Sequence, residues 1–374
     1  MHPIPDPLTK LYVEITTTCN LECRMCVRRA WYEPTGAMPL ETFRALMDQV
    51  RALPTPPTIH LGGYGEPTTH PDFREIVRLA KGTGARVEMT TNGTLITEDL
   101  ATALIDLGLD RLVVSIDGVS DGQYENIRTG GSLARVIENL RTLWRIKLRK
   151  KNRHADPQVG IAFVAMKRNI ADLPELPRLA TWIGASEIKV SNVVPHTPEM
   201  EAEILYDRSL TACTYRAGHY LPDMSLPKLD VDGFTADPLR RVFNATVSLS
   251  LLDVSLSGRD NYCRFVQEGY AAVRWDGAVS PCMSLLHDHP EYIHGRRKDV
   301  THHTLGNINE RSLGDIWDSP EYRAYRARLK AFRFSPCTTC GGCERFAANY
   351  NDCQENNFPT CGGCLWAQGF VQCP

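Results

Sequence analysis

Six short apolar runs, rich in β-branched residues, recur through the first half of the chain and constrain its fold more than any other feature. β-Branched side chains favour strands because they fit the pleated, half-buried surface of a sheet. Each run therefore predicts a strand. The predicted strands cover residues 11–16, 58–63, 85–90, 111–116, 159–166 and 187–194.

Segments with helical periodicity separate these strands. Between residues 70 and 84, apolar side chains recur at i, i+3, i+4 and i+7 from Phe73, and Thr97 can cap a further helix. Serial strand–helix units build a parallel sheet with helices packed outside it. A complete eight-unit barrel needs about 250 residues. Because only residues 1–195 carry the pattern, we expect an α/β fold with a partial (β/α)6 barrel of the TIM type.

The net charge and the hydropathy pattern predict a protein of a reducing compartment. A net charge of −2 indicates no bulk attraction to nucleic acid or to anionic membranes. No apolar run approaches the roughly 20 residues that cross a bilayer, and the first ten residues lack the core of a signal peptide. We therefore expect a cytoplasmic protein with no nucleic-acid or membrane partner. Dense, patterned thiols in that compartment indicate metal binding rather than disulfides.

The 13 cysteines are unevenly spread, and the first three form a distinct motif. Cys19, Cys23 and Cys26 have the spacing CxxxCxxC directly after the first predicted strand. Structural zinc usually takes four protein ligands, whereas three leave one metal position open for an exchangeable group. The spacing therefore favours an iron-sulfur centre over structural zinc.

Glycine and polar residues follow the next strands. The second strand ends in GGYGEP at 62–67, the third in TTNG at 90–93 and the fourth in SIDG at 115–118. Such residues are also common in ordinary turns between strands and helices. Because parallel strands present their carboxyl ends at one rim, where barrel folds carry their chemistry, these motifs instead point to one site.

Together, the cysteine motif, the glycine-rich strand end and SIDG resemble the radical S-adenosylmethionine (radical SAM) superfamily over residues 8–195. The resemblance implies that Cys19, Cys23 and Cys26 hold three irons of a [4Fe-4S] cluster while the fourth iron binds SAM. It further implies reductive cleavage of SAM to methionine and a 5'-deoxyadenosyl radical.

The family's amino-group motif matches the second strand end. Gly62, Gly63, Gly65 and Glu66 lie at the positions that receive the SAM ammonium group. An anionic side chain beside closely approaching backbone suits such a cation. This chain departs from the common GGGE form by inserting Tyr64, which leaves open which glycine makes the contact.

Further SAM contacts follow from the same resemblance. Ser115 and Asp117 match positions that meet the ribose or methionyl part of SAM, and Asn92 is a candidate on the third strand. Arg128 is expected to pair with the SAM carboxylate, with an ordinary surface arginine as the alternative. Met25 stands where the family usually places an aromatic residue beside the adenine. No catalytic residue is identified.

The last third of the chain has a second cysteine pattern. Cys263 and Cys282 flank Gly277 with thirteen and four intervening residues, which resembles the start of the iron-sulfur domain called SPASM or twitch. The Asp-Gly pair at 276–277 predicts a hairpin that brings the two thiols together, and residues 305–326 resemble that domain's helical segment. We therefore expect domains at 1–195 and 263–374, joined by a bridging segment at 196–262.

Nine cysteines lie in this C-terminal region, one more than two closed four-iron clusters require. We expect two auxiliary [4Fe-4S] clusters with one thiol spare, which makes three clusters in all. Cys263 and Cys282 are expected to begin the first, and Cys361, Cys364 and Cys373 to lie in the second. A zinc-ribbon-like site remains the alternative, and Cys213 is expected to be an ordinary buried thiol. The nine candidates are Cys263, Cys282, Cys337, Cys340, Cys343, Cys353, Cys361, Cys364 and Cys373.

The closing residues, 352–374, resemble radical SAM maturases associated with tungsten-containing oxidoreductases. The resemblance implies an electron donor such as ferredoxin or flavodoxin, and a client that is an enzyme, a peptide or a cofactor precursor. Two alternatives stay open: a peptide-modifying maturase of the SPASM type, and a non-catalytic electron carrier or zinc scaffold.

Overall fold

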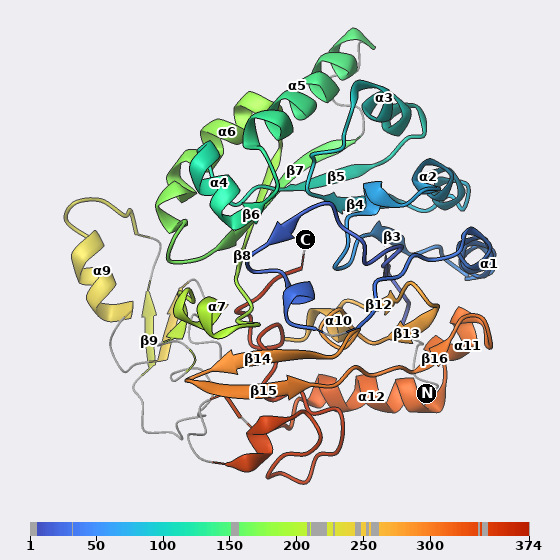
Figure 1. Ribbon diagram of the computed structural model, residues 1–374. Coiled ribbons are helices and arrows are strands. Elements are labelled where there is room, and N and C mark those ends of the chain that lie inside the picture. Colours follow the sequence, from blue (N-terminus) through green and yellow to red (C-terminus); the bar gives the residue numbers. More distant parts are fainter. Residues whose placement is uncertain are drawn as a thin grey trace.

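A computed structural model describes residues 6–31, 33–150, 157–207, 210, 223–226, 229–243, 248–251, 254–255, 262–335, 337–338 and 343–373. All six predicted strands are present and lie parallel in the order β1-β3-β4-β5-β7-β8, which confirms the predicted partial barrel (Figure 1). Their bounds are β1 Lys10–Val13, β3 Thr58–Leu61, β4 Val87–Thr91, β5 Arg111–Ser115, β7 Gln158–Ala165 and β8 Glu187–Asn192.

Helices cover the outer face of this sheet (Figure 1). The apolar face predicted from Phe73 is buried in α2, and Thr97 caps α3 by accepting a hydrogen bond from the backbone N–H of Leu100 at 3.2 Å. Buried apolar side chains from helices and strands form one continuous core. The helices are α1 Leu40–Arg51, α2 Phe73–Lys81, α3 Glu98–Asp106, α4 Asp121–Ile127, α5 Leu133–Arg149 and α6 Leu176–Ile183.

The C-terminal region extends the same sheet rather than building a separate one. Strand β12 (Tyr270–Val273) pairs in parallel with β1, and β13 (Ala278–Ser280) and β16 (Gly306–Asn307) follow it, which gives nine strands. The predicted hairpin joins β12 and β13, where Gly277 has a φ of 88° that favours glycine. The backbone hydrogen bonds of β1 therefore join the two predicted domains directly.

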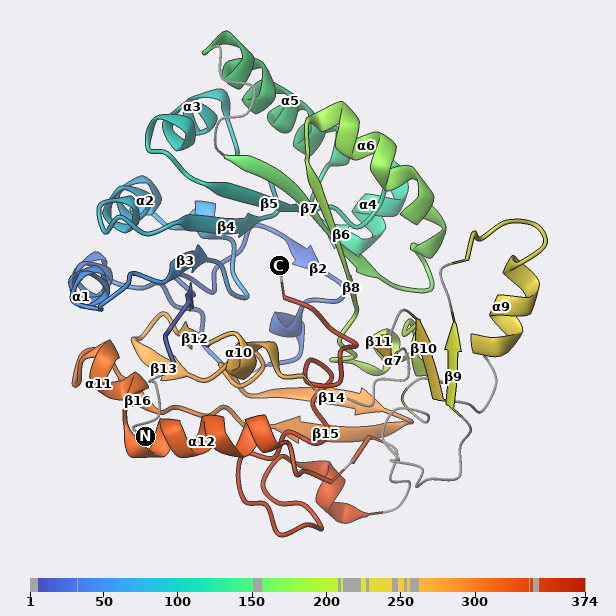
Figure 2. The same cartoon turned by 180° about the vertical axis from the view of Figure 1, so that it is seen from behind.

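The remaining C-terminal elements close the open side of the barrel (Figure 2). Their final segment has no regular secondary structure and runs back into the space enclosed by the strands, toward the C terminus. The elements are α10 Arg264–Gln267, the hairpin β14 His289–Ile293 and β15 Arg296–Val300, α11 Leu313–Trp317 and α12 Pro320–Ala331.

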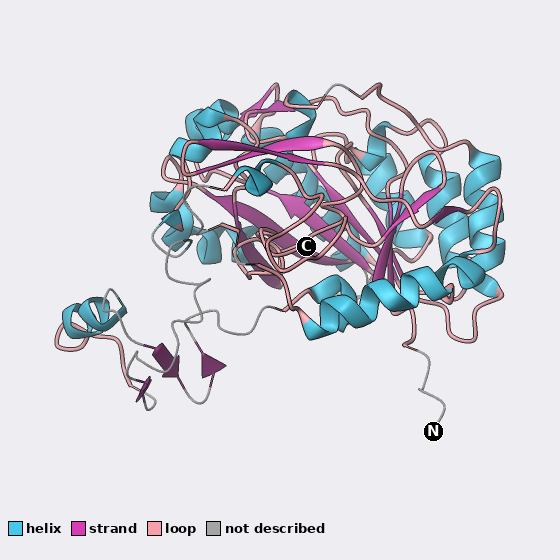
Figure 3. Ribbon diagram, turned by 90° about the horizontal axis from the view of Figure 1, so that it is seen from below, coloured by secondary structure: helices cyan, strands magenta, loops and turns pink. Residues whose placement is uncertain are grey.

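The predicted bridging segment contains α7 Pro198–Ala202, α9 Ala236–Phe243 and a three-stranded sheet. This sheet and α9 stand apart from the barrel (Figure 3). Its strands are β9 Asp223–Leu226, β10 Ser248–Leu251 and β11 Val254–Ser255. Cys213 lies outside the described residues. Among the helices of the described part, none is both long and apolar enough to cross a membrane.

Candidate active site

The first three cysteines lie in the loop between β1 and α1, at the carboxyl end of the barrel strands. Strand β2 (Glu22–Cys23) fixes this loop by pairing with β6 (Arg128–Thr129), and the backbone N–H of Arg24 donates to the carbonyl of Ile127 at 2.9 Å. The middle cysteine is thus held in a short sheet against the end of α4.

The glycine-rich strand end packs directly against the same loop. A Cβ added at Gly65 would lie 2.1 Å from the carbonyl oxygen of Thr16, which no side chain permits. The next N–H, that of Glu66, donates to the carbonyl of Thr18 at 2.8 Å. Glycine is therefore required at position 65 by the close approach of two backbones.

The carboxylate of Glu66 is buried and accepts four hydrogen bonds from the protein. Oε1 accepts from the N–H and hydroxyl of Thr68 and from the hydroxyl of Thr91 at 2.8 Å, and Oε2 accepts from the N–H of Asn92 at 2.7 Å. Burial raises the pKa of Glu66, and these donors act against that shift. The carboxylate thus ties the ends of β3 and β4 together and leaves acceptor capacity mainly on Oε2.

Cys23 lies beside a buried positive charge. Burial raises the pKa of the Cys23 thiol to about 11, and the guanidinium of Arg128, whose Nη1 lies 3.9 Å from Sγ, counteracts this. Asp117 holds the guanidinium through Oδ2, at 2.7 Å from Nε and 2.6 Å from Nη2. A buried positive charge beside the sulfur favours its anionic, metal-binding form.

Hydrogen-bond donors also surround Cys19. Its sulfur accepts from the backbone N–H of Leu21 at 3.4 Å and from the side-chain amide of Asn92 at 3.9 Å. Donors aimed at thiolate sulfur are typical of iron-sulfur ligation, where they also set the reduction potential. The donor set of this loop therefore fits three thiolate ligands of an iron-sulfur cluster.

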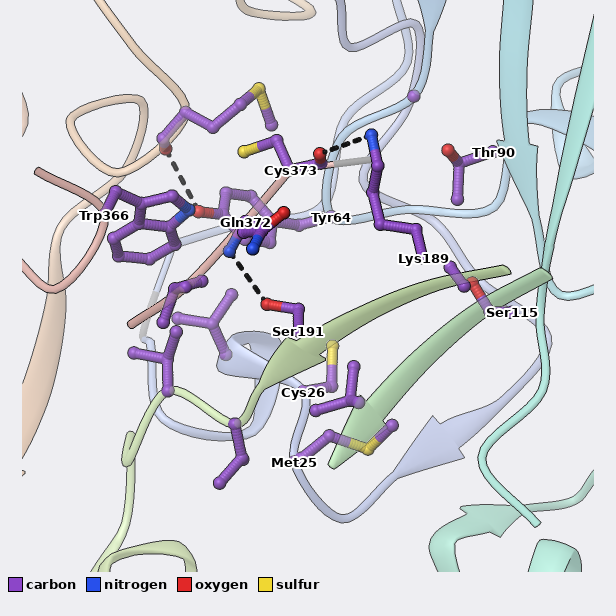
Figure 4. A pocket seen from close by; sticks show the side chains of 18 of the residues that line it. Met25, Cys26, Tyr64, Thr90, Ser115, Lys189, Ser191, Trp366, Gln372 and Cys373 are labelled. Atoms are coloured by element: carbon purple, nitrogen blue, oxygen red, sulfur yellow. Dashed lines mark hydrogen bonds between the residues drawn. The ribbon is translucent and has the colours of Figure 1, made fainter. Parts of the chain in front are cut away.

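A cavity of about 310 Å³ opens beside this loop, inside the barrel. Its lining comes from the cysteine loop at Met25–Val27, the strand end at Gly62–Tyr64, and the chain terminus at Val371–Cys373. Figure 4 shows Met25 and Cys26 on one side of the cavity, with Tyr64, Trp366 and Cys373 on the other. Its volume is in the range of small-molecule sites.

The structure divides the predicted SAM residues into two groups. Met25, Gly62, Gly63 and Ser115 line the cavity, where they can meet a ligand. The other five do not line the cavity. Their side chains or backbones contact the cysteine loop and the strand ends. These are Gly65, Glu66, Asn92, Asp117 and Arg128. Contact of all nine with SAM stays a prediction.

His196, which follows strand β8, is buried and lines the cavity. Its Nδ1 lies 3.0 Å from the carbonyl of Pro290, and burial lowers its pKa to about 3. This histidine is therefore a neutral part of the cavity wall.

Sequence reasoning missed a charged contact between the two ends of the chain. His287 places Nε2 2.7 Å from Glu14 and Nδ1 2.6 Å from Glu33, on either side of the cysteine loop in sequence. Burial lowers the pKa of His287, but its hydrogen bonds to the two carboxylates outweigh this and raise the pKa to about 9. No local motif marks this histidine, because its partners are more than 250 residues away.

Four C-terminal cysteines converge on a second, buried cavity. Cys263 begins α10, Cys282 follows β13, and Cys361 and Cys364 come from the terminal loop. Burial raises the pKa of the Cys263 thiol to about 12, and the hydroxyl of Tyr325 lies 3.7 Å from the sulfur of Cys361. Four thiols in a water-poor pocket fit a closed metal centre, since metal binding deprotonates them.

This arrangement differs from the partition expected from the sequence. Cys361 and Cys364 line the same cavity as Cys263 and Cys282, whereas the sequence placed them in different centres. The reason is tertiary: the terminal loop folds back onto the β12–β13 hairpin, which spacing along the chain does not reveal. Cys373 is not among the residues that line this four-thiol cavity and lies in the barrel cavity instead.

The spacing of the thiols also bears on the zinc alternative. Tetrahedral zinc with bonds of about 2.3 Å would hold its sulfurs about 3.8 Å apart. Within the described residues, no three cysteine sulfurs lie within 4.8 Å of one another. A single zinc ion would therefore require these sulfurs to move closer together.

Cys353 lies in a loop organised by Asp352. The carboxylate of Asp352 accepts hydrogen bonds from the N–H groups of Ser335, Gln354 and Asn356. The hydroxyl of Ser335 lies 3.0 Å from the sulfur of Cys353. Cys337 and Cys343 are described on neighbouring segments, whereas Cys340 lies outside the described residues.

Comparison with known proteins agrees with this geometry. The model of the radical SAM superfamily matches residues 13–155, and that of an iron-sulfur cluster-binding domain, SPASM, matches residues 263–344. The tungsten-containing aldehyde ferredoxin oxidoreductase cofactor-modifying protein of Pyrococcus furiosus is 32% identical, over 97% of this chain and 96% of its own. An AdoMet-dependent heme synthase of Methanosarcina barkeri is 33% identical, over 82% of this chain and 81% of its own.

Among solved structures, Streptococcus suis SuiB bound to precursor peptide SuiA shares the fold, with a TM-score of 0.59 and 18% identity, over 90% of this chain and 70% of SuiB. The two family models and the Pyrococcus furiosus relative confirm the family assignment made from the cysteine motifs, and the matched domains indicate SAM and iron-sulfur clusters as cofactors. The chain belongs to the radical SAM superfamily, as an enzyme that carries a SPASM iron-sulfur domain.

Proposed function

We propose that this enzyme matures a tungsten-containing oxidoreductase by modifying its cofactor. The observation that carries the proposal is the similarity to the cofactor-modifying protein of Pyrococcus furiosus, which extends over nearly the whole of both chains. A relationship over that length includes the barrel cavity and the terminal segment that helps to line it.

The residues around the barrel cavity have separate roles in this reaction. When bound, the cluster supplies the single electron that cleaves SAM to methionine and a 5'-deoxyadenosyl radical. Cys19, Cys23 and Cys26 hold the cluster, and Arg128 neutralises part of the thiolate charge. Gly62 and Gly63 let SAM approach the strand end. Trp366 and the terminal residues shield the cavity from water, which protects a carbon-centred radical from side reactions.

We further propose three [4Fe-4S] clusters. The first takes the three loop cysteines, and the second takes the thiols of the four-thiol cavity, Cys263, Cys282, Cys361 and Cys364. The thiols left for a third are Cys337, Cys340, Cys343 and Cys353, which makes Cys373 the spare. A ferredoxin or flavodoxin supplies the electron.

Anaerobic turnover tests the function. Reconstituted enzyme with SAM, a low-potential reductant and the organic cofactor released from a tungsten oxidoreductase should form 5'-deoxyadenosine, together with a cofactor product of altered mass. Cys23→Ala should form neither. Cleavage of SAM in the presence of the cofactor, without any change in the mass of the cofactor, would uphold the radical chemistry and refute the proposed client.

A further inference from the structure

A third cavity, of about 360 Å³, lies at the opposite end of the barrel from the cysteine loop. It is lined near the first residues of the strands, by Lys10 of β1, Glu88 of β4 and Arg111 of β5. Tyr12 and Lys189 line this lower cavity and also the upper one that holds Met25 and Cys26. These two side chains therefore stand in the walls of both cavities.

Positive charge dominates the lower cavity. Lys10, Arg111, Lys189 and Arg264 line it, against the single carboxylate of Glu88. Glu88 is already engaged: its Oε2 lies 3.0 Å from Nζ of Lys10 and 3.5 Å from Nη1 of Arg111. Two carboxylates outside the lining pair with the arginines, Glu187 with Arg111 at 2.5 Å and Glu268 with Arg264 at 2.9 Å.

Among the cations that line this cavity, Lys189 is the one without an ion pair to a described carboxylate. Its Nζ donates to the backbone carbonyl of Cys373 at 3.2 Å, and no carboxylate of the described residues lies within 4.0 Å of it. Burial lowers the pKa of Lys189, and the nearby Arg264 and Arg111 lower it further. A half-buried ammonium among other cations gains free energy when an anion binds beside it.

We propose that the lower cavity binds an oxyanion, phosphate or carboxylate, at the end of an elongated small-molecule substrate, with Lys189 as its principal contact. This inference rests on the proposed function, because the other end of the same molecule would then reach the upper cavity beside Met25 and Cys26. Anchoring the charged end fixes which carbon faces the radical, and holding a reactant in one orientation is a large part of catalysis.

Binding of small anions tests the proposal without turnover. Cluster-reconstituted enzyme saturated with SAM is titrated anaerobically with pyrophosphate, and separately with succinate, by calorimetry. Wild-type enzyme should bind at least one of them saturably at one site. Preference for pyrophosphate assigns a phosphate tail, and preference for succinate assigns a carboxylate tail.

Two variants make the test specific. Lys189→Met should weaken binding of the preferred anion at least tenfold, whereas Lys189→Arg should largely retain it. Lys167→Met is the matched control, because Nζ of Lys167 also donates to a backbone carbonyl, that of Ala202 at 2.8 Å, but does not line the cavity. Equal affinity in wild type and Lys189→Met, or no saturable binding by wild type, would overturn the proposal.

The outcome is separable from that of the proposed function. Substrate-free formation of 5'-deoxyadenosine by the wild-type enzyme reports the radical chemistry alone, whereas the anion titration measures binding without turnover. Unchanged iron content and circular dichroism would show that Lys189→Met folds. A failed anion titration would leave the client assignment to be judged by the cofactor product.

Discussion

Nη1 of Arg128 lies 3.9 Å from the sulfur of Cys23, and the same guanidinium forms a buried ion pair with Asp117. The side chain of Asp117 is fully buried, so its charge depends on this partner. Removing one member of a buried ion pair costs about 3–5 kcal/mol because the other charge is left uncompensated. Arg128→Met should therefore lower the free energy of unfolding by that amount in urea denaturation of reconstituted protein.

The double variant Arg128→Met/Asp117→Asn provides the control. It removes both charges, and the stability it regains relative to Arg128→Met measures the cost of the orphaned carboxylate. If the single and double variants are equally unstable, the ion pair is not what Arg128 contributes, and its contact with Cys23 would remain as the explanation.

Glu66 can be tested as both a brace and a ligand. Glu66→Gln removes the charge and points an amide N–H₂ at groups that are themselves donors, so we expect a loss of about 1–3 kcal/mol in stability and weaker SAM binding. Thr91→Val is the matched variant, since it deletes one donor to Oε1 and keeps the carboxylate. Calorimetric SAM titration should show weakened binding only in Glu66→Gln; equal weakening in both would assign Glu66 a purely structural role.

The fold and the cysteine loop could be predicted because their signals are local. The six strands and the hairpin at Gly277 follow from apolar patterning and turn chemistry over fewer than 20 residues each. The contact of His287 with Glu14 could not, because it depends on β12 pairing with β1 and on the segment after β13 returning to the cysteine loop. The regrouping of Cys361 and Cys364 has the same origin, since thiol spacing does not record how a terminal loop folds back.

His287 should make stability depend on pH. The pKa of His287 is raised from an ordinary 6.5 to about 9 in the folded state. The free energy that the protonated imidazole contributes to folding is therefore fully present below about pH 6.5 and is lost as pH rises through about 9. A shift of this size corresponds to at most about 3 kcal/mol. His287→Gln should therefore be less stable than wild type at pH 6, and this difference should shrink by pH 9.5.

Urea midpoints at several pH values check this expectation, with Glu14, Glu33 and Arg274 as the charged groups facing the imidazole or its partners. His294→Gln, which alters a partly exposed imidazole paired with Asp207 at 3.5 Å, should keep the wild-type profile. A difference between His287→Gln and wild type that stays constant from pH 6 to 9.5 would mean that the histidine is not protonated in the folded protein.

The cavity shared by four thiols predicts how much iron each cysteine variant should lose. Because Cys263, Cys282, Cys361 and Cys364 share one cavity, Cys282→Ala and the double variant Cys361→Ala/Cys364→Ala should each lose the same four irons of an expected twelve. Combining them should remove no more iron than either alone.

Cys353→Ala should instead remove a different set of about four irons. Cys373→Ala is the matched control, since its thiol faces the barrel cavity, and it should retain all the iron. Iron and sulfide analysis with electron paramagnetic resonance checks these counts, and loss of eight irons from the combined variant would restore the partition into separate centres.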